Sequence, residues 1–367
     1  MRVHLVDPSA YTPPYDHALC EALASAGAQV ELYTSHFAHG PAPVAEGYRR
    51  VELFYRRAAR VRSARARRVA KLVEHVPDML RYRRLSAAAD VVHFQWLPVQ
   101  HLDGLLLPRE QAGSRPVLVL TAHDILPREP RPGQRSAQRR LYERFDAVVV
   151  HTDHGRRRLE ELGVEADRVH VIPHGAFEHL ARETAEAPAP LRGEGPVVLC
   201  FGLIRPYKGV DVLLEAWRGI DSAELWIVGA PRMDVSGLVA GAPPGVRFVP
   251  RFVSEGELRA CFRRADLVVL PYREIDQSGV LFTALAFGKP LLLSDVGGFP
   301  EIAATGAART FPAGDAGGLR TALQELMANR EALSEMASRA RELAAGEYSW
   351  ARIARLTLAL YEQLVSG

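Results

Sequence analysis

The chain has 367 residues, of which 48% are hydrophobic and 24% are charged, and its formal net charge at pH 7 is +3. A chain of this length is long for one hydrophobic core and suits two domains of roughly 150–200 residues each. So small a net charge does not indicate a nucleic-acid partner. No apolar run reaches the roughly 18–20 residues that a membrane-spanning helix needs. We therefore expect a two-domain globular protein that binds no nucleic acid.

The three cysteines, Cys20, Cys200 and Cys261, are widely spaced and embedded in apolar runs. This placement predicts buried free thiols in a reducing compartment, not a disulfide framework or a metal site. The N-terminus leads directly into a strand-like run, so we expect no signal peptide. A cytoplasmic location is therefore the expectation.

The first half of the chain alternates between predicted strands and helices. Residues 2–6 form an apolar run of strand length, residues 15–23 carry a helical stripe that stops before Gly27, and residues 29–33 form the next strand. Strand, helix and strand in this order predict a βαβ unit and hence a parallel sheet. Further strands are predicted at residues 91–95, 117–121, 147–151 and 169–172.

Residues 49–84 are rich in arginine, especially between 56 and 68 and between 81 and 84, and apolar residues stand between the arginines. The pattern favours one or two amphipathic helices. A basic amphipathic helix can lie on an anionic membrane surface, but the same pattern is typical of a solvated helix face. The sequence leaves both interpretations open.

Polar and aromatic residues follow two of these predicted strands, at the edge where open α/β sheets bind ligands. Trp96 follows the strand at 91–95, and His123 and Asp124 follow the strand at 117–121. Asp124 is a candidate to orient the imidazole of His123 or to cap the next turn. A lone histidine is more often structural than functional, so the residues alone leave the role of His123 open.

Residues 181–196 are rich in Ala, Pro, Glu and Gly without an apolar period, which is typical of a linker. Beyond them, predicted helices again fall between most of the predicted strands, and apolar residues between 350 and 364 recur at helical spacing. The strands of this second half are predicted at residues 197–201, 224–228, 246–249, 267–270 and 290–294.

The stretch VVLCFGLIRPYKGVDVLLEAW, residues 197–217, predicts a strand, a turn opened by Gly202, and a helix. The turn carries Arg205 and Lys208 beside the first backbone N–H groups of the helix, which have no partner within the helix. Two cations at such a helix start, outside the carboxyl end of a strand, indicate a phosphate or diphosphate site. The alternative is that both cations are solvated turn residues.

A second stretch, DQSGVLFTALAFGKPLLLSDVGGFPE at residues 276–301, places Ser278 and Gly279 just before a helical stripe. A turn of small residues at a helix N-terminus lets backbone N–H groups reach an anion. We therefore expect this helix start to converge with Arg205 and Lys208 on one diphosphate.

The two stretches resemble the phosphate-binding and donor-binding segments of retaining GT-B glycosyltransferases of family 4, also described as glycosyl transferases group 1. The resemblance runs through nearly the whole chain. It implies an α/β fold of two Rossmann-like parallel-sheet domains that face a cleft. Residues 1–180 would form the acceptor-side domain, 181–196 the linker, 197–348 the nucleotide-sugar-binding domain, and 349–367 a C-terminal helix that returns to the first domain.

The same resemblance implies a hexosyltransferase that moves a sugar, with retention, from a nucleotide-sugar donor to an acceptor hydroxyl. The acceptor would be a carbohydrate, a lipid-linked molecule or a small molecule, in polysaccharide, glycolipid or glycosylated-metabolite synthesis. No cofactor and no metal are expected, because the chain has no Asp-x-Asp motif. Peripheral contact of residues 56–84 with the inner face of a membrane stays open.

The implied site residues fall into four groups. The catalytic candidates are His123, Arg205 and Lys208. The candidates for binding the donor diphosphate are Gly202, Arg205, Lys208, Ser278, Gly279 and Val280. The candidates for binding the nucleotide and sugar are Asp276, Gln277, Thr283, Gly297, Gly298 and Glu301. The acceptor-side candidates are Tyr15, Asp16, Trp96 and Asp124.

The chain departs from the family pattern at two places. Relatives usually carry two glutamates eight positions apart, the second of which binds the nucleotide ribose, but Ile275 and Thr283 stand at these positions here. A branch of the family carries Gln-Ser-Gly-Val between them, as this chain does. In the first loop, Tyr11 and Thr12 precede two prolines where relatives often have a Gly-Gly pair.

Three alternatives follow from these departures and from the fold. The chain would be an inactive GT-B paralogue that acts as a partner or sugar-binding subunit, or a GT-B sugar-nucleotide epimerase. A Rossmann dehydrogenase is the weakest alternative, because no Gly-x-Gly-x-x-Gly follows the first predicted strand.

Overall fold

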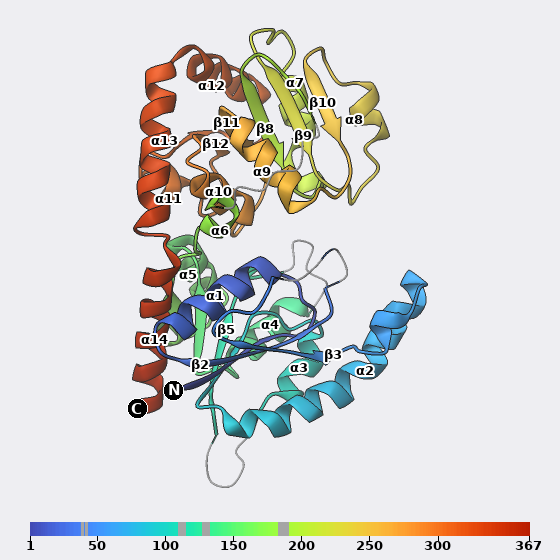
Figure 1. Ribbon diagram of the computed structural model, residues 1–367, viewed down its shortest axis with the longest axis vertical. Coiled ribbons are helices and arrows are strands. Elements are labelled where there is room, and N and C mark those ends of the chain that lie inside the picture. The colour runs from blue at the N-terminus through green and yellow to red at the C-terminus, as the bar shows by residue number, and fades with distance from the viewer. Residues whose placement is uncertain (38–39, 41–42, 109–114, 127–132, 183–190) are drawn as a thin grey trace. The chain divides into compact units, whose positions relative to one another are not determined.

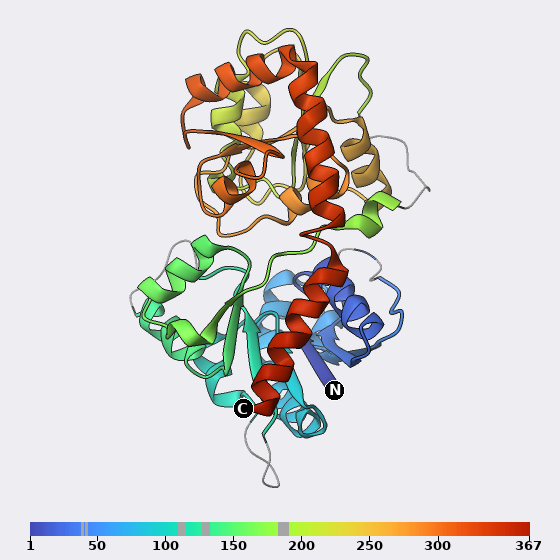
Figure 2. The same ribbon diagram turned by 90° about the vertical axis from the view of Figure 1, so that its left-hand side faces the viewer.

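The structure is a computed structural model that describes residues 1–37, 40, 43–108, 115–126, 133–182 and 191–367 (Figures 1 and 2). It divides into two compact units. Unit 1 contains Met1–His174 and Trp350–Gly367, and unit 2 contains Gly175–Ser349. The predicted boundary at residue 180 therefore differs from the observed one, because residues 175–180 cluster with unit 2. Half of the predicted linker, residues 183–190, lies outside the described residues.

Unit 1 is built on a parallel sheet of seven strands in the order β3-β2-β1-β4-β5-β6-β7. Its strands are β1 (Arg2–Asp7), β2 (Gln29–Ser35), β3 (Arg49–Phe54), β4 (Val91–Phe94), β5 (Val117–Thr121), β6 (Ala147–Val150) and β7 (Val169–Val171). The central strands are rich in Val and Leu and are buried on both faces, as expected for a parallel sheet covered by helices, and they also bury His4 and His93.

Helices cover both faces of this sheet (Figures 1 and 2). Helix α14 packs against α1 and β5, and α3 contacts both α2 and α4. The C-terminal helix is thus part of unit 1. The helices of unit 1 are α1 (Pro13–Ser25), α2 (Ala64–Leu85), α3 (Gln100–Leu106), α4 (Gln134–Tyr142), α5 (Asp153–Glu161) and α14 (Trp350–Ser366).

Unit 2 repeats the same plan with six parallel strands in the order β10-β9-β8-β11-β12-β13. Its strands are β8 (Val197–Phe201), β9 (Glu224–Val228), β10 (Val246–Val249), β11 (Leu267–Leu270), β12 (Leu291–Ser294) and β13 (Ala308–Phe311). Its helices are α6 (Glu178–Arg182), α7 (Val210–Ala216), α8 (Ser236–Ala240), α9 (Glu255–Arg264), α10 (Gly279–Ala286), α11 (Phe299–Ala303), α12 (Ala316–Ala328) and α13 (Arg330–Ala345).

In both units the strand order reverses at one point, between β1 and β4 and between β8 and β11. Loops that leave such a switch point on the carboxyl side diverge, and ligands of open α/β sheets bind in the crevice between them. The loops after these four strands are therefore where a site is to be sought in each unit.

Each strand predicted from the sequence is present, but one predicted helical region is wrong in part. Residues 49–54 form β3, which pairs with β2 in parallel. Leu53 and Phe54 are buried in the core of unit 1, so partnering with β2 overrides the arginine-rich, helix-like pattern. Only the later part of that region is helical, chiefly as α2, and β13 is a strand that the sequence did not predict.

Candidate functional site

The first candidate site lies at the carboxyl edge of the sheet of unit 2. After β8, Gly202 adopts a φ of +107°, and the 3-10 turn Pro206–Lys208 leads through Gly209 into α7. Gly209 has a φ of +64°, and a Cβ atom there would lie 1.9 Å from the carbonyl oxygen of Pro271. Glycine is thus required for the loop after β8 to pack on the loop after β11.

Arg273, which the sequence did not single out, ties these two loops together. Its backbone N–H donates to the carbonyl of Tyr207 at 2.7 Å, and its guanidinium donates to the carbonyl of Pro206 at 2.9 Å. The guanidinium also donates to both carboxylate oxygens of Asp211, at 2.8 and 2.6 Å, which lowers the pKa of that carboxyl group. Such a two-bond ion pair fixes orientation as well as distance.

Lys208 is buried at the centre of this site. Its Nζ atom donates to the hydroxyl of Tyr272 at 2.7 Å and lies 4.4 Å from the centroid of the same ring. The Tyr272 hydroxyl lies 3.5 Å from Oγ of Ser278, and Oγ of Ser294 donates to the Tyr272 carbonyl at 2.6 Å. Tyr272 therefore connects two predicted site residues, Lys208 and Ser278. The one signal in the sequence that could have found it is its place two residues after the end of β11.

The start of α10 meets the turn after β8. A Cβ atom on Gly202 would lie 3.1 Å from Val280 Cγ2 and 3.3 Å from Nζ of Lys208. Ser278 is the N-cap residue of α10 and Gly279 is its first residue. The structure therefore brings the predicted diphosphate-binding residues of both stretches together around one helix N-terminus, which favours an anion.

Arg205 stands at the N-cap position of the 3-10 turn. Its Nε atom is buried and has no hydrogen-bond partner among the described residues. A buried donor without a partner is costly, so this atom is suited to a ligand that would accept from it.

The predicted nucleotide-binding and sugar-binding residues lie around this centre. Thr283 is buried in α10, and its hydroxyl donates to the carbonyl of Gly279 at 2.9 Å. Ile275, where relatives have an acid, is also buried, and a Cβ atom on Gly297 would lie 1.8 Å from its carbonyl oxygen. Asp276 and Gln277 lie between Ile275 and Thr283. Gly298 is the N-cap of α11, and Glu301 lies in the first turn of α11.

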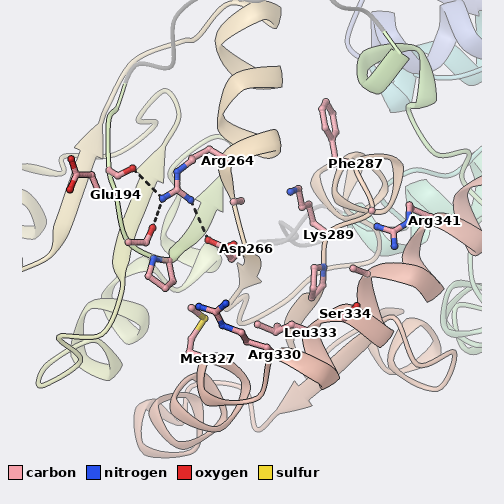
Figure 3. A pocket seen from close by; sticks show the side chains of 17 residues that line it. Glu194, Arg264, Asp266, Phe287, Lys289, Met327, Arg330, Leu333, Ser334 and Arg341 are labelled. Atoms are coloured by element: carbon pink, nitrogen blue, oxygen red, sulfur yellow. Dashed lines mark hydrogen bonds and ion pairs between the residues drawn. The ribbon is translucent and has the colours of Figure 1, made fainter.

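A cavity of about 770 Å³ lies at the opposite edge of the same sheet (Figure 3). Its lining includes Pro196, Asp266 and Pro290, which directly precede β8, β11 and β12. Arg264 donates there to the carbonyl of Gly193 at 3.1 Å, and Lys289 donates to the carbonyl of Arg263 at 2.9 Å. These two cations hold the backbone together, and none of the predicted donor-binding residues lines the cavity.

In unit 1, two buried carboxyl groups, those of Asp7 and Asp16, hold the loop after β1 in place. Asp7 accepts backbone N–H groups from Ser9 at 3.0 Å, Tyr11 at 2.5 Å and Thr12 at 3.3 Å. Asp16 forms a hydrogen bond with Asp7, and burial raises the pKa of both groups, more so that of Asp16. Asp16 is 1% exposed, and its hydrogen bond with Asp7 supports the loop from the helix that follows.

The predicted residues Tyr15 and His123 belong to a cluster of aromatic and imidazole rings. The buried ring of Tyr15 lies 4.8 Å from that of His123, 5.6 Å from that of His151 and 4.9 Å from that of His174. Burial lowers the pKa of His123 well below 6.5 and that of His151 to about 4. Both imidazoles are therefore neutral at pH 7.

The hydrogen bonds of this cluster fix which nitrogen of each imidazole carries the proton. Nδ1 of His151 lies 2.9 Å from the carbonyl of Ile172 and must donate to it. Nε2 of His151 then accepts from Nδ1 of His123 at 3.2 Å, so Nε2 of a neutral His123 carries a lone pair. That nitrogen faces the amide of Gln95 at 3.1 Å. With the amide turned so that its NH2 group donates to His123, the Gln95 nitrogen gains the partner it otherwise lacks.

Both nitrogens of His123 are thus engaged by His151 and Gln95, and the neighbouring Asp124 is exposed. His151 and Gln95 are the residues that sequence reasoning missed here. The predicted Trp96 stacks on His123 with 4.9 Å between ring centroids, and its Nε1 atom donates to the hydroxyl of Thr12 at 3.0 Å.

Three further observations apply to the described residues. The thiols of Cys20, Cys200 and Cys261 are free and buried. No group of three or more His, Cys, Asp or Glu side chains is arranged in the described part to hold a metal ion. Among the described helices, none combines the length and the apolar character that crossing a membrane requires.

Two sequence families match the chain. Glycosyltransferase Family 4 matches residues 15–176, and Glycosyl transferases group 1 matches residues 195–329. A D-inositol 3-phosphate glycosyltransferase of Nocardia farcinica is 31% identical over 260 residues, which cover 63% of this chain and 56% of that protein. A GDP-mannose:glycolipid 4-beta-D-mannosyltransferase of Xanthomonas campestris pv. campestris is 30% identical over 249 residues, 61% of this chain and 68% of that protein.

A GDP-mannose-dependent alpha-(1-6)-phosphatidylinositol monomannoside mannosyltransferase of Mycobacterium tuberculosis is 28% identical over 297 residues, 75% of this chain and 77% of that protein. Among solved structures, sucrose-phosphate synthase from Thermosynechococcus elongatus has a TM-score of 0.79 at 21% identity, covering 100% of this chain and 99% of that chain. HepE from Anabaena, solved with UDP-glucose, has a TM-score of 0.75 at 16% identity, covering 99% of this chain and 100% of that chain. The fold, the two family matches and the Xanthomonas relative all indicate the same family. The chain belongs to the family 4 glycosyltransferases with the GT-B fold.

Proposed function

We propose that this protein transfers a sugar from a nucleotide-sugar donor to an acceptor hydroxyl. The observation that carries the proposal is the cluster of Lys208, Tyr272 and Ser278 beside the start of α10 and the turn at Gly202. A lysine that lies beside a helix N-terminus at the switch point of a parallel sheet is well placed to bind the diphosphate of such a donor. Relatives named for GDP-mannose and a similar fold solved with UDP-glucose support this donor class.

In the proposed reaction, negative charge builds on the diphosphate as the bond from the sugar carbon to the leaving oxygen breaks. Arg205, Lys208 and the N-terminus of α10 stabilise that charge, which is where preorganised groups contribute most. These groups suffice without a metal ion in our proposal. The loop residues from Asp276 to Gln277 and from Gly297 to Glu301, with Thr283, contact the nucleotide and sugar, and His123 contacts the reacting sugar.

We propose that the anomeric configuration is retained, with attack from the face of the leaving group. The relatives do not decide this, because two that are named for GDP-mannose are named for an alpha and a beta product. Inversion needs a general base for the acceptor hydroxyl. Asp7 and Asp16 are buried, and both nitrogens of His123 are engaged, so these three residues are not placed to act as that base. The one-bond coupling between the anomeric carbon of the product and its proton, measured by NMR, would reveal inversion.

The first test is a thermal-shift screen against UDP, GDP, ADP, dTDP and their common sugar conjugates, with and without Mg²⁺, followed by turnover with the donor that binds. A ligand at about 100 times its dissociation constant stabilises the protein by about 2.7 kcal/mol. Replacing Arg205 or Lys208 with Ala should lower turnover about 10²-fold. Wild-type turnover in both variants would remove this turn from the mechanism.

The same screen separates the alternatives. Binding of a donor without transfer to any acceptor would favour an inactive sugar-binding paralogue. Release of an epimerised sugar nucleotide without transfer would favour an epimerase. No shift with any nucleotide would contradict the proposed donor site.

We also propose that the acceptor is a carbohydrate or lipid-linked molecule and that unit 1 reaches it at the cytoplasmic face of a membrane through α2. Val69, Leu72 and Val73 are 62%, 61% and 69% exposed and lie at helical spacing on α2. Arg65 and Arg68 are exposed on the same helix. Apolar side chains beside cations fit an anionic lipid surface.

Flotation with vesicles that contain phosphatidylglycerol tests this contact. The wild-type protein should float at low salt and float less as salt rises, because screening weakens its attraction to the lipid. The variant Leu72→Glu should float less than the wild type. Val239→Glu, a change at an exposed apolar residue of unit 2, is the matched control. Equal flotation with neutral and anionic vesicles would contradict the role of the arginines.

A further inference from the structure

The cavity at the amino end of the sheet of unit 2 is lined by positive charges (Figure 3). Its volume of about 770 Å³ is in the range of pockets that hold small molecules. Neither the proposed transfer reaction nor the proposed membrane contact uses this cavity. Its charged lining residues are four cations and two carboxylates, namely Arg264, Lys289, Arg330, Arg341, Glu194 and Asp266.

Two of the four cations have a structural task in unit 2. Arg264 lies 3.3 Å from the carboxylate of Asp266, and Lys289 donates to the carbonyl of Arg263 at 2.9 Å. Asp266 therefore offsets one positive charge. The carboxylate of Glu194 is exposed and points away from the four cations (Figure 3). The lining as a whole keeps a surplus of positive charge.

The other two cations, Arg330 and Arg341, project from α13. Neither guanidinium group forms a hydrogen bond or an ion pair within the part of the chain that the structure describes. Arg341 lies directly over Gly288, where an added Cβ atom would be 2.6 Å from its Cγ and 3.0 Å from a guanidinium nitrogen. This packing directs Arg341 to the end of α10, beside Lys289.

The positive charges lie close enough to affect one another. Burial lowers the pKa of Lys289, and the charges of Arg341 and Arg264 lower it further, against the opposing effect of Asp266. Like charges that the fold holds near one another repel, so an anion that binds among them is attracted by each of them. The cavity is therefore suited to an anionic ligand.

Helix α13 sets the distance between the two arginines that lack a partner. They are eleven positions apart, which places their Cα atoms about 16 Å apart along the helix axis. Leu333, Ser334 and Ala337 lie between them at helical spacing and line the cavity as well. A ligand that follows this face therefore meets cations at both ends and uncharged side chains in the middle.

We propose that this cavity binds a small organic bisphosphate, a molecule with a phosphate group at each end of an uncharged middle part. Arg341 and Lys289 bind one phosphate, and Arg330 binds the other. Guanidinium groups match phosphate oxygens with paired hydrogen bonds, and the ammonium group of Lys289 has further N–H donors besides the one that Arg263 accepts. A dicarboxylate fits less well, because each of its ends carries less charge and fewer acceptor oxygens than a phosphate.

Isothermal titration calorimetry of the full chain with fructose 1,6-bisphosphate, fructose 6-phosphate and adipate tests the proposal. The wild type should bind the bisphosphate at least tenfold more tightly than the monophosphate or the dicarboxylate, and added salt should weaken this binding. Arg330→Gln and Arg341→Gln should each weaken it about tenfold, because each removes a hydrogen bond to a charged group. Both arginines are exposed, so both variants should keep the unfolding temperature of the wild type.

Arg339→Gln is the matched control, because it removes an exposed positive charge of α13 that does not line the cavity, and it should keep the wild-type affinity. Lys208→Ala should also bind the bisphosphate as the wild type does, since Lys208 belongs to the opposite edge of the sheet. Loss of binding in Lys208→Ala would place the bisphosphate at the candidate donor site and overturn the proposal. Full affinity in both arginine variants, equal binding of fructose 6-phosphate or adipate, or no binding of the bisphosphate would overturn it too.

Discussion

Tyr272 shows how a single residue sets the chemistry of its neighbour. Its hydroxyl accepts from Lys208, and its ring faces the same ammonium group. The two residues are 64 positions apart in the chain, so neither sequence motif contains both. A lysine held in this way keeps its charge directed at one place, which is what a site for a leaving diphosphate requires.

Tyr272→Phe should weaken the binding of the nucleotide diphosphate about fivefold, because the change removes one hydrogen bond that involves a charged group and keeps the ring. Tyr272→Leu should weaken it further, because the contact between the cation and the ring is lost as well. Isothermal titration calorimetry with the nucleotide found in the screen measures both. Tyr348→Phe removes a hydroxyl elsewhere in unit 2 and serves as the control. An unchanged affinity in Tyr272→Leu would show that Tyr272 does not orient Lys208.

The buried histidines of unit 1 make its stability depend on pH. Burial lowers the pKa of His93 to about 3 and that of His151 to about 4, from an ordinary value of 6.5. Between pH 6.5 and about 4, the unfolded chain therefore binds protons at these residues that the folded unit does not. Their contribution to the free energy of unfolding is complete above pH 6.5 and falls as the pH is lowered through this window.

We expect His93→Gln to reduce this dependence on pH. Glutamine stays neutral at every pH in the window, so the free energy of unfolding should fall less steeply between pH 6.5 and about 4 than in the wild type. Urea unfolding at several pH values measures the slope. Equal slopes in wild type and His93→Gln would contradict the assignment of a neutral, buried imidazole.

At the scale of elements, the turn between β8 and α7 is shaped by packing as much as by its own residues. Its cations could be read from the sequence as a phosphate site. The sequence does not reveal that Arg273 joins the turn to the loop after β11, or that Gly209 contacts Pro271. Both contacts depend on how β11 lies beside β8. In the same way, pairing with β2 makes residues 49–54 a strand in an arginine-rich region.

Gly209→Ala should disrupt this turn and with it the binding of nucleotide. The new Cβ atom would lie 1.9 Å from the Pro271 carbonyl, so one of the two loops must move. Gly219→Ala is the matched control, because Gly219 also has a positive φ, +81°, but a Cβ atom added there would meet no atom of the described residues within 4 Å. Both variants should lose about 1 kcal/mol or more of stability to backbone strain, and the nucleotide-induced thermal shift should fall only in Gly209→Ala. A full shift in Gly209→Ala would separate the turn from the site.

At the scale of the whole molecule, the chain builds two cores, and its last helix belongs to the first of them. Helix α14 packs on α1, and the buried hydroxyl of Tyr361 lies 2.6 Å from Nδ1 of His93. Residues separated by most of the chain thus complete one core. We expect the two units to unfold in separable transitions, because each has its own buried cluster.

Tyr361→Ala should lower the stability of unit 1 by about 3–5 kcal/mol, the usual cost of truncating a buried aromatic side chain. Phe262→Ala, at a fully buried residue of unit 2, should lower the other transition instead. Differential scanning calorimetry, with nucleotide added to mark unit 2, assigns the transitions. A loss in both transitions from either single change would mean that the units do not unfold independently.

Local patterns in the amino-acid sequence were enough to predict nearly all of the strands, the parallel α/β class, the family and the two stretches that supply the candidate donor site. They were enough because apolar runs of strand length, glycines in turns and cations beside helix starts lie within a few residues of one another. The return of the C-terminal helix was implied only by resemblance, and residues 183–190 of the expected linker lie outside the described residues.

Which side chains meet could be learned from the folded chain alone. Folding placed Tyr272 on Lys208, His151 on His123 and Tyr11 on Trp96, and it buried Asp16, which the sequence had offered as an acceptor-side residue. The physical reason is common to all four. Parallel strands deliver the loops that follow them to one edge of the sheet, so residues far apart in the chain become neighbours there, and no local pattern records which of them will touch.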